Sequence, residues 1–210
     1  LILAQEVGHL DALSKKGSLQ KLPDSAFDGV DARFVDPDKE WVGTSGRLRV
    51  VVLDARQVPE GERPQSLKDL ADPAWKGKLG WAPTNGSMQS HLGALCNLWG
   101  EDDTRTWLKG VVANEPKRYP KNSPQVDAAE RGEIALGWVN HYYLHRAERK
   151  HAVNYSFTAE HDAGNILMLA GGAIPASADN AEGAQKVLAA LTGADAQAYF
   201  AGEVFEYPVR

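Results

Sequence analysis

Apolar and polar positions along the chain follow two spacings, one typical of helices and the other typical of strands. Val7, Leu10 and Leu13 lie three residues apart, which predicts a helix over residues 6–16. Trp107, Leu108 and Val111 share one face of a second predicted helix. This second helix covers residues 104–112, and the other predicted helices cover residues 66–70, 88–98, 125–131, 141–150, 182–191 and 194–200.

Short apolar runs between these helices predict buried strands. The run over residues 47–53 is rich in valine and long enough for a central strand buried on both faces. Further strands are predicted over residues 1–4, 79–82, 133–140 and 166–170. Because strands alternate with helices through short connections, we expect an α/β fold with a mostly parallel sheet. Such sheets bind ligands beyond the carboxyl ends of their strands.

Composition argues against several classes of protein. The 210 residues carry a net charge of −5 and no basic run, which disfavours a nucleic-acid partner. No apolar stretch approaches the roughly 20 residues of a membrane helix. Cys96 is the only cysteine, and its apolar neighbours predict a buried position in the core. The sequence has no phosphate loop, nucleophile elbow or paired-carboxylate motif, so nothing in it supports an enzyme.

Two adjacent tyrosines, Tyr142 and Tyr143, directly follow a predicted strand. Neighbours in a helix lie about 100° apart, so both phenols can converge on one ligand above the turn. A phenolate is a hard anionic donor that suits a hard trivalent cation such as Fe(III). The alternative, favoured by the dipeptide alone, is a pair of half-buried aromatic residues with hydrated hydroxyls.

Three polar turns surround these tyrosines in the predicted fold. Asn85, Gly86 and Ser87 lie at a helix start, where backbone N–H groups and the helix dipole favour an anion. A simple helix cap by Asn85 or Ser87 is an equal alternative. Asn122 lies in a second turn before a helix, and Asn140 lies just before the tyrosines. Three such turns at the mouth of one sheet predict a shared pocket.

The histidines offer weaker candidates for a metal site. His141 and His145 have the i,i+4 spacing of a helical zinc pair, but the Glu that the hydrolytic motif places after the first His is absent. Surface histidines are therefore the favoured interpretation of this pair, and His91 is also expected in solvent.

Several strings of the sequence carry a resemblance to a known family. They are Trp41-Val-Gly-Thr-Ser-Gly-Arg-Leu-Arg-Val-Val-Val, Asp69-Leu-Ala-Asp-Pro-Ala-Trp-Lys-Gly-Lys-Leu-Gly-Trp-Ala-Pro-Thr, Tyr119-Pro-Lys-Asn-Ser-Pro, Val139-Asn-His-Tyr-Tyr and Glu206-Tyr-Pro. In this order they resemble the bacterial ferric-iron-binding proteins of ABC transporters. Those are two-lobed periplasmic binding proteins of type II with a transferrin-like site, and the resemblance is collinear over the whole chain.

The resemblance implies how the chain divides. Residues 1–48 would form part of the first lobe, 49–170 the second lobe and 171–210 the return to the first lobe. The strand over residues 47–53 would be one crossing between lobes. We also expect the chain to be truncated at both ends, the native protein being longer by several tens of residues at its N-terminus and beginning with an export signal.

The resemblance also implies the site. Tyr142 and Tyr143 would bind Fe(III) with a synergistic phosphate or carbonate. The turn Asn85-Gly86-Ser87 would hold the anion together with Asn122 and Asn140.

Two positions depart from the family pattern. Many relatives have a Glu ligand where Gln5 stands here, and whether the neighbouring Glu6 replaces it is open. Some relatives add a third tyrosine in the anion turn, where this chain has Ser87 and Met88. Relatives often supply a His ligand from near their N-terminus, and we expect this chain to begin after that point. We therefore expect a site dominated by tyrosine and completed by the anion or water.

The function implied is capture of Fe(III) and its delivery to the permease of an ABC importer. The protein would be an exported monomer in the periplasm or outside the cell, either free or lipid-anchored, with no nucleic-acid partner. A receptor for a free oxyanion or small anionic solute, using the same asparagine turns without metal, is the first alternative. An enzyme with a mononuclear metal site is a more distant one.

Overall fold

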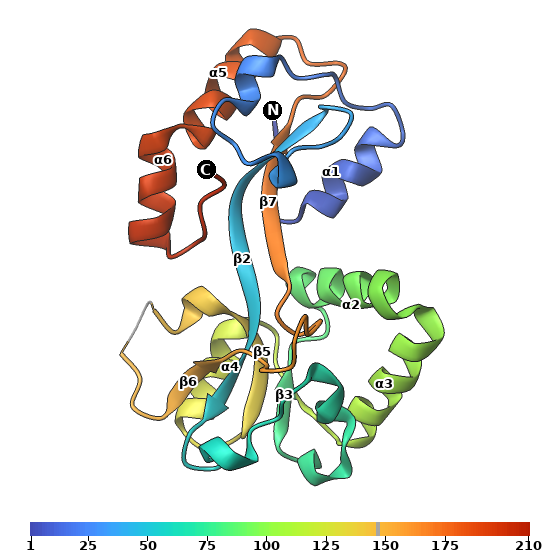
Figure 1. Cartoon of the computed structure of the whole chain (residues 1–210), viewed down its shortest axis with the longest axis vertical. Coiled ribbons are helices and arrows are strands. Elements are labelled where there is room, and N and C mark those ends of the chain that lie inside the picture. Colours follow the sequence, from blue (N-terminus) through green and yellow to red (C-terminus); the bar gives the residue numbers. More distant parts are fainter. Residues whose placement is uncertain (146–147) are drawn as a thin grey trace. The chain divides into compact units, whose positions relative to one another are not determined.

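The structure, a computed structural model, describes residues 1–145 and 148–210 (Figure 1). Its α-helices are α1 (Val7–Ser14), α2 (Gly86–Trp99), α3 (Glu101–Ala113), α4 (Asn122–Glu130), α5 (Ala181–Thr192) and α6 (Ala194–Tyr199). Its strands are β1 (Ile2–Ala4), β2 (Trp41–Asp54), β3 (Leu79–Trp81), β4 (Lys117–Arg118), β5 (Leu136–Asn140), β6 (Ala152–Tyr155) and β7 (Leu167–Ala173). Strands and helices alternate, which confirms the predicted α/β class.

The chain forms two compact units. Unit 1 contains Leu1–Arg47 and Leu167–Arg210, and unit 2 contains Leu48–Ile166. The chain passes from one unit to the other between residues 47 and 48 and between residues 166 and 167, whereas the predicted lobes change between residues 48 and 49 and between residues 170 and 171. That these units are the lobes of a binding protein stays a prediction.

Unit 1 is built on three strands in the order β1–β7–β2. β1 pairs antiparallel with β7, with Leu3 opposite Gly172. Helix α1 packs closely on β7 because Gly171 has no side chain there. A Cβ on Gly171 would lie 2.8 Å from a methyl carbon of Val7. Leu188 of α5 belongs to a hydrophobic core of this unit.

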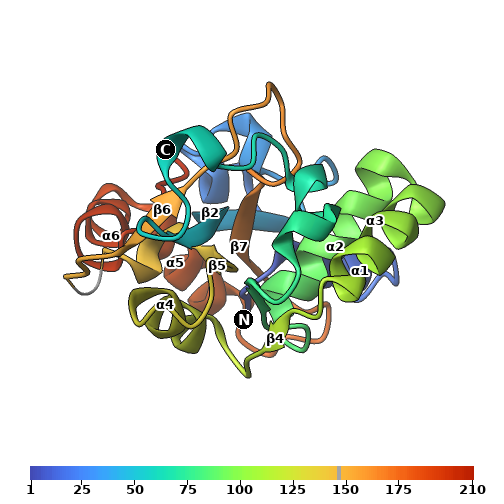
Figure 2. The same ribbon diagram turned by 90° about the horizontal axis from the view of Figure 1, so that it is seen from below.

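Unit 2 contains a five-stranded sheet in the order β6–β2–β5–β3–β4. Residues of β2 alternate between two cores. Val51 and Leu53 belong to the core formed with α2 and α3, whereas Val50 and Val52 belong to the core formed with α4. The two groups of helices therefore cover opposite faces of this sheet (Figures 1 and 2). This burial on both faces explains the continuous apolar run that predicted a central strand.

The predicted parallel pairing holds for only part of the sheet in unit 2. β3 pairs parallel with both β4 and β5, but β2 pairs antiparallel with β5 and with β6. A run of apolar residues reveals burial on both faces, but it carries no information about strand direction. β2 is followed by short 3₁₀ turns rather than by a crossover helix back to a parallel neighbour. The prediction of a mostly parallel sheet is wrong in this respect.

Three local predictions also differ from the structure. The predicted helix over residues 141–150 is a 3₁₀ turn, His141–Tyr143, and residues 146 and 147 lie outside the described residues. Strand β6, which pairs with the end of β2, is not among the strands predicted from the sequence. Cys96 is partly exposed on α2 rather than buried. Within the described residues, every helix is too short or too polar to cross a lipid bilayer.

The carboxylate of Glu130 holds the start of β6 in place. It accepts hydrogen bonds from the backbone N–H groups of Lys150, His151 and Ala152 at 3.1, 3.0 and 2.8 Å. These bonds, those from Ala152 and His151 above all, lower the pKa of Glu130 to about 2.

We expect Glu130→Gln to lower the unfolding temperature at pH 7, because a neutral amide accepts these bonds less strongly. A carboxyl with a lowered pKa stabilises the fold above its unfolded pKa, and this contribution is lost as the pH falls through about 2. Thermal unfolding of both proteins from pH 7 to pH 2 measures the effect. The gap between them should narrow with acid, and a gap that stays constant would contradict this role for the charge.

Candidate metal and anion site

The three polar turns predicted from the sequence lie at one edge of the sheet in unit 2. β5, β3 and β4 run parallel, so their carboxyl ends share that edge. β3 leads through Asn85 into α2. β4 leads through Lys121 into α4, and Figure 2 shows this second connection. β5 ends at Asn140 and leads directly into the tyrosine turn.

The turn before α2 is a capped helix start. Asn85 is the N-cap residue, and its side-chain oxygen accepts the backbone N–H of Ser87 at 3.1 Å. Asn85 therefore caps the helix, as the alternative interpretation predicted. The backbone N–H of Ser87, which was predicted to bind the anion, donates to Asn85 instead. A Cβ built on Gly86 would meet no atom within 4 Å, so the backbone at Gly86 is open to close approach.

The turn before α4 is tied to the neighbouring strand. Asn122 is the first residue of α4 and is buried. Its side-chain oxygen accepts a long hydrogen bond of 3.4 Å from Gln125. Gln125 in turn exchanges hydrogen bonds with the backbone N–H and carbonyl of Trp138 on β5. The start of α4 is thereby held against β5.

Asn140 connects a buried cation to a tyrosine. Its side-chain oxygen accepts a hydrogen bond of 2.8 Å from Nη1 of Arg49. Its side-chain nitrogen donates to the hydroxyl oxygen of Tyr142 at 3.1 Å. Because the guanidinium can only donate, this pairing orients the amide and directs an N–H at the phenol oxygen.

The two tyrosine rings lie side by side on the 3₁₀ turn. Their centroids are 4.6 Å apart and their planes meet at 37°. Tyr142 is buried and Tyr143 is half-buried. The 3₁₀ turn replaces the predicted helix, yet both rings are brought together next to Asn140.

The histidines next to the tyrosines do not form the helical zinc pair that the sequence already disfavoured, but the favoured interpretation, two surface histidines, is wrong for His141, which is buried. His141 lies on the 3₁₀ turn, and its Nδ1 accepts the backbone N–H of Leu48 at 3.2 Å. Its ring centroid is 6.2 Å from that of His145. In the part of the chain that the structure describes, no group of three or more His, Cys, Asp or Glu side chains could hold a metal ion.

Arg49 is the residue that the sequence analysis missed. It lies on β2 opposite Asn140 and is fully buried. Besides its bond to Asn140, its Nη2 lies 4.0 Å from the sulfur of Met88 in the first turn of α2. A buried positive charge thus links the end of β5 to the start of α2. The signal available in the sequence was an arginine adjoining the apolar run of a strand buried on both faces.

His91 interacts electrostatically with Arg49 and is uncharged at neutral pH. Its Nε2 donates to the carbonyl of Ala163 at 2.8 Å, and the side chain is buried, which corrects the expectation that it is in solvent. Burial lowers the pKa of His91 to about 4, and the positive charge of Arg49 acts in the same direction. Arg49 therefore provides the fixed positive charge in this region.

Glu6, whose role was left open, has a buried partner within unit 1. Its carboxylate accepts a hydrogen bond of 3.0 Å from Nη2 of Arg47, which also contacts the carbonyl of Gln5. Glu6 and Arg47 are both buried, whereas Gln5 is exposed. Separating this pair would leave a buried charge, so the carboxylate of Glu6 is engaged by Arg47.

Sequence comparison finds iron-binding relatives. The chain is 33% identical over 213 residues to the "Major ferric iron-binding protein" of Neisseria meningitidis, covering 98% of this chain and 64% of that protein. It is 28% identical to the "Fe(3+)-binding periplasmic protein" of Serratia marcescens, covering 86% of this chain and 55% of that protein. The chain thus spans less than two thirds of the length of these curated relatives.

Solved structures of bacterial ferric-iron-binding proteins have the same fold as this chain. Iron-bound HitA from Pseudomonas aeruginosa has a TM-score of 0.91 at 27% identity, covering 99% of this chain and 69% of that one. The apo ferric ion-binding protein A of Pasteurella haemolytica has a TM-score of 0.90 at 26% identity, with coverage of 99% and 68%. The family model described as "Bacterial extracellular solute-binding protein" matches residues 1–210. This confirms the prediction of a binding protein rather than an enzyme, and the chain belongs to the bacterial extracellular solute-binding protein family.

Proposed function

We propose that this protein captures Fe(III) together with an anion and delivers it to an ABC importer. The observation that carries the proposal is the pair of adjacent rings of Tyr142 and Tyr143, next to an Asn140 that is itself held by Arg49. The names of the Neisseria and Serratia relatives, which describe ferric iron binding, support the same ligand.

The chemistry of the tyrosines suits a hard cation. A phenol ordinarily loses its proton near pH 10, and a trivalent cation at the oxygen makes that loss easy at neutral pH. The N–H that Asn140 directs at the oxygen of Tyr142 would stabilise a phenolate more than a phenol, because hydrogen bonds to ionised acceptors are stronger. Tyr143 would provide the second phenolate from the adjacent position.

The anion would balance the charge that remains. Fe(III) with two phenolates carries one positive charge, and Arg49 adds another close by. We propose that phosphate or carbonate is held by Asn85, Gly86, Ser87, Asn122 and Asn140, with Arg49 behind Asn140. Citrate is a third candidate, since a structure of the Trichodesmium protein FutA, 29% identical to this chain, is described as containing "iron and citrate ligands".

The setting proposed for this function is outside the cytoplasm. The family is described as extracellular and the Serratia relative as periplasmic. We propose an exported monomer, free or lipid-anchored, whose two units are the lobes of the binding protein and which docks on the membrane permease of an ABC transporter.

A receptor for a free oxyanion is the second candidate. Arg49 and the three asparagine turns would serve such a ligand without metal, and one observation favours it: the buried charge of Arg49 lies next to Asn140 and the start of α2. The two candidates differ in the role of the tyrosines, which the free-anion receptor does not require.

We expect Asn140→Ala to weaken iron retention by roughly 10- to 100-fold, the usual cost of losing a partner that orients a metal ligand. The variant removes the N–H directed at Tyr142 and the acceptor for Arg49, but no metal ligand. Competition of the loaded protein with a chelator, at several phosphate and carbonate concentrations, measures the effect.

Asn154→Ala is the matched control. Asn154 donates to the carbonyl of His141 at 2.8 Å, so it holds the same turn without touching the phenol. Its loss should weaken iron retention less. An iron affinity that is independent of every added anion and equal in both variants would refute the shared site.

A further inference from the structure

Two basic residues, Arg118 and Lys121, precede Asn122. With Lys117 they fall within five residues, with no acid between positions 116 and 126, but the ammonium of Lys117 is held before β5 at the opposite edge of the sheet. All three side chains are exposed. Lys117 donates to the carbonyl of Glu133 at 2.7 Å. Arg118 and Lys121 take part in no ion pair among the described residues. Other bases of unit 2, such as Lys76, Arg131 and Arg149, do form ion pairs.

The other two turns at this sheet edge also lack negative charge. Residues 83–91 and 138–145 contain no Asp or Glu, although acids outnumber bases in the chain by 28 to 23. Helices α2 and α4 begin here, so their dipoles add positive potential. These turns therefore combine the buried charge of Arg49 with Arg118 and Lys121 and contain no acid of their own, while Asp162 acts on His91 close by.

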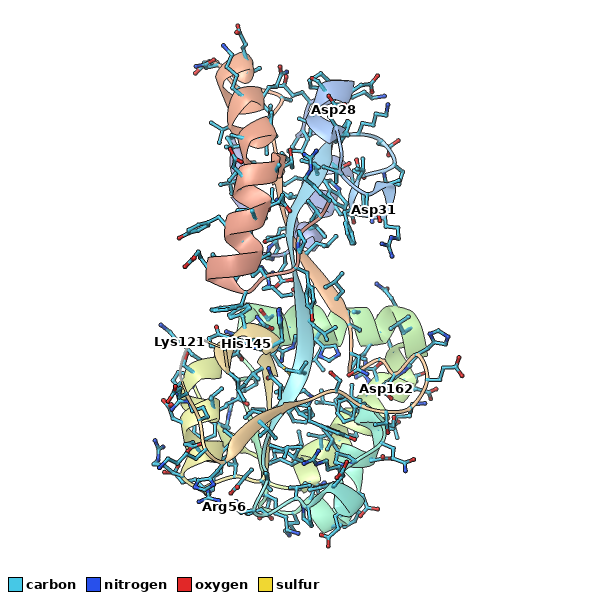
Figure 3. All side chains as sticks on the ribbon, turned by 60° about the vertical axis from the view of Figure 1, so that its left-hand side comes forward. Asp28, Asp31, Arg56, Lys121, His145 and Asp162 are labelled. Atoms are coloured by element: carbon cyan, nitrogen blue, oxygen red, sulfur yellow. The ribbon has the colours of Figure 1, made fainter. Side chains whose placement is uncertain are left out.

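The opposite edge of the sheet carries charges of both signs. β2 is antiparallel to β5, so the end of β2 lies at that other edge. Asp54, Glu60 and Glu62 follow there, and Arg56 is paired with Asp54. In Figure 3, Lys121 and His145 lie at one end of unit 2 and Arg56 at the other. Lys76 and Arg131 also lie at that edge, where they pair with Glu115 and Glu133, whereas Arg118 and Lys121 make no ion pair among the described residues.

We infer that iron reaches this protein as an anionic complex, such as a chelate with a hydroxycarboxylate, rather than as a cation. The inference rests on the proposed function. Positive charge at the edge with Arg118 and Lys121 attracts an anionic chelate and repels a cation, and its field acts over about 8 Å at physiological salt, before any contact forms. Its effect falls on the association rate constant, which such fields raise by roughly 10- to 1,000-fold.

The test is the double variant Arg118→Glu/Lys121→Glu. Lys121 makes no side-chain cap to α4, so its replacement leaves the capping of the helix unchanged. Stopped-flow mixing with ferric citrate in excess citrate, followed by the visible band, gives the association rate constant. We expect the variant to bind roughly 10-fold more slowly at low salt, and the salt dependence of the wild type to be lost or reversed.

Two further variants sharpen the result. Arg118→Gln/Lys121→Gln should give a smaller decrease. Lys76→Glu makes the same charge change per residue at an exposed position before β3, hence at the opposite sheet edge, and should leave the rate within about twofold of wild type. The double glutamate variant would overturn the inference if it bound as fast as Lys76→Glu or faster. A wild type that takes up no iron refutes the proposed function instead, so the two failures are distinguishable.

Discussion

Replacing either tyrosine of the pair by phenylalanine should abolish tight Fe(III) binding. Loss of an outer partner of a metal ligand costs roughly 10- to 100-fold in affinity, so loss of a ligand itself should cost at least about 100-fold. Tyr142→Phe and Tyr143→Phe each remove one phenolate. Both variants should also lose, or strongly shift, the visible charge-transfer band between phenolate and iron.

The fold should survive both changes. Phenylalanine keeps the ring, so the contact between the two rings at 4.6 Å is preserved. Tyr142→Phe removes the hydroxyl that accepts from Asn140, which costs about 1 kcal/mol of stability. Tyr143→Phe leaves the hydrogen bond between Asn140 and Tyr142 in place. Circular dichroism and thermal unfolding serve as the folding control, and wild-type colour and affinity in both variants would refute the assignment of these ligands.

Replacing Arg49 by methionine should have the second largest effect. The variant removes the only charge that the structure places on Asn140, and with it the balance for a bound anion. We expect iron retention in phosphate or carbonate to fall about 100-fold, which corresponds to about 2.7 kcal/mol. Methionine is unbranched and flexible, so it can fill the buried volume beside Met88.

Arg49→Lys separates the charge from the shape of the guanidinium. Lysine keeps the positive charge but cannot donate from two nitrogens in a fixed plane, so it should recover only part of the iron retention. Iron affinity measured against phosphate concentration gives the result. The role assigned to Arg49 would be contradicted if Arg49→Met kept the wild-type dependence on the anion.

The sequence predicted that the three polar turns share one edge of the sheet better than it predicted the direction of the strands. The polar turns at Asn85 and Asn140 could be placed because each follows a short apolar run, and those at Asn85 and Asn122 because each precedes a helix. The direction of β2 could not be predicted, because an apolar run reports burial and not pairing. β6 has no apolar alternation of its own, and its first residue, Ala152, is held by Glu130, which lies 22 positions earlier.

The role of Arg49 could not be derived from its neighbours in the chain. Its partners, Asn140 and Met88, are 91 and 39 residues away. Nor could the pairing of Glu6 with Arg47, 41 residues apart, be read from local patterns. Contacts of this kind depend on strand register, which the structure supplies for β2 and β5.

The visible absorption spectrum of the purified protein, recorded during titration with Fe(III), tests the central claim most directly. We predict a charge-transfer band that grows to saturation at one iron per protein, that depends on added phosphate, carbonate or citrate, and that is absent from Tyr142→Phe/Tyr143→Phe. A protein that stays colourless while it binds phosphate would show that the asparagine turns and Arg49 serve a free anion, and that the tyrosines do not bind iron.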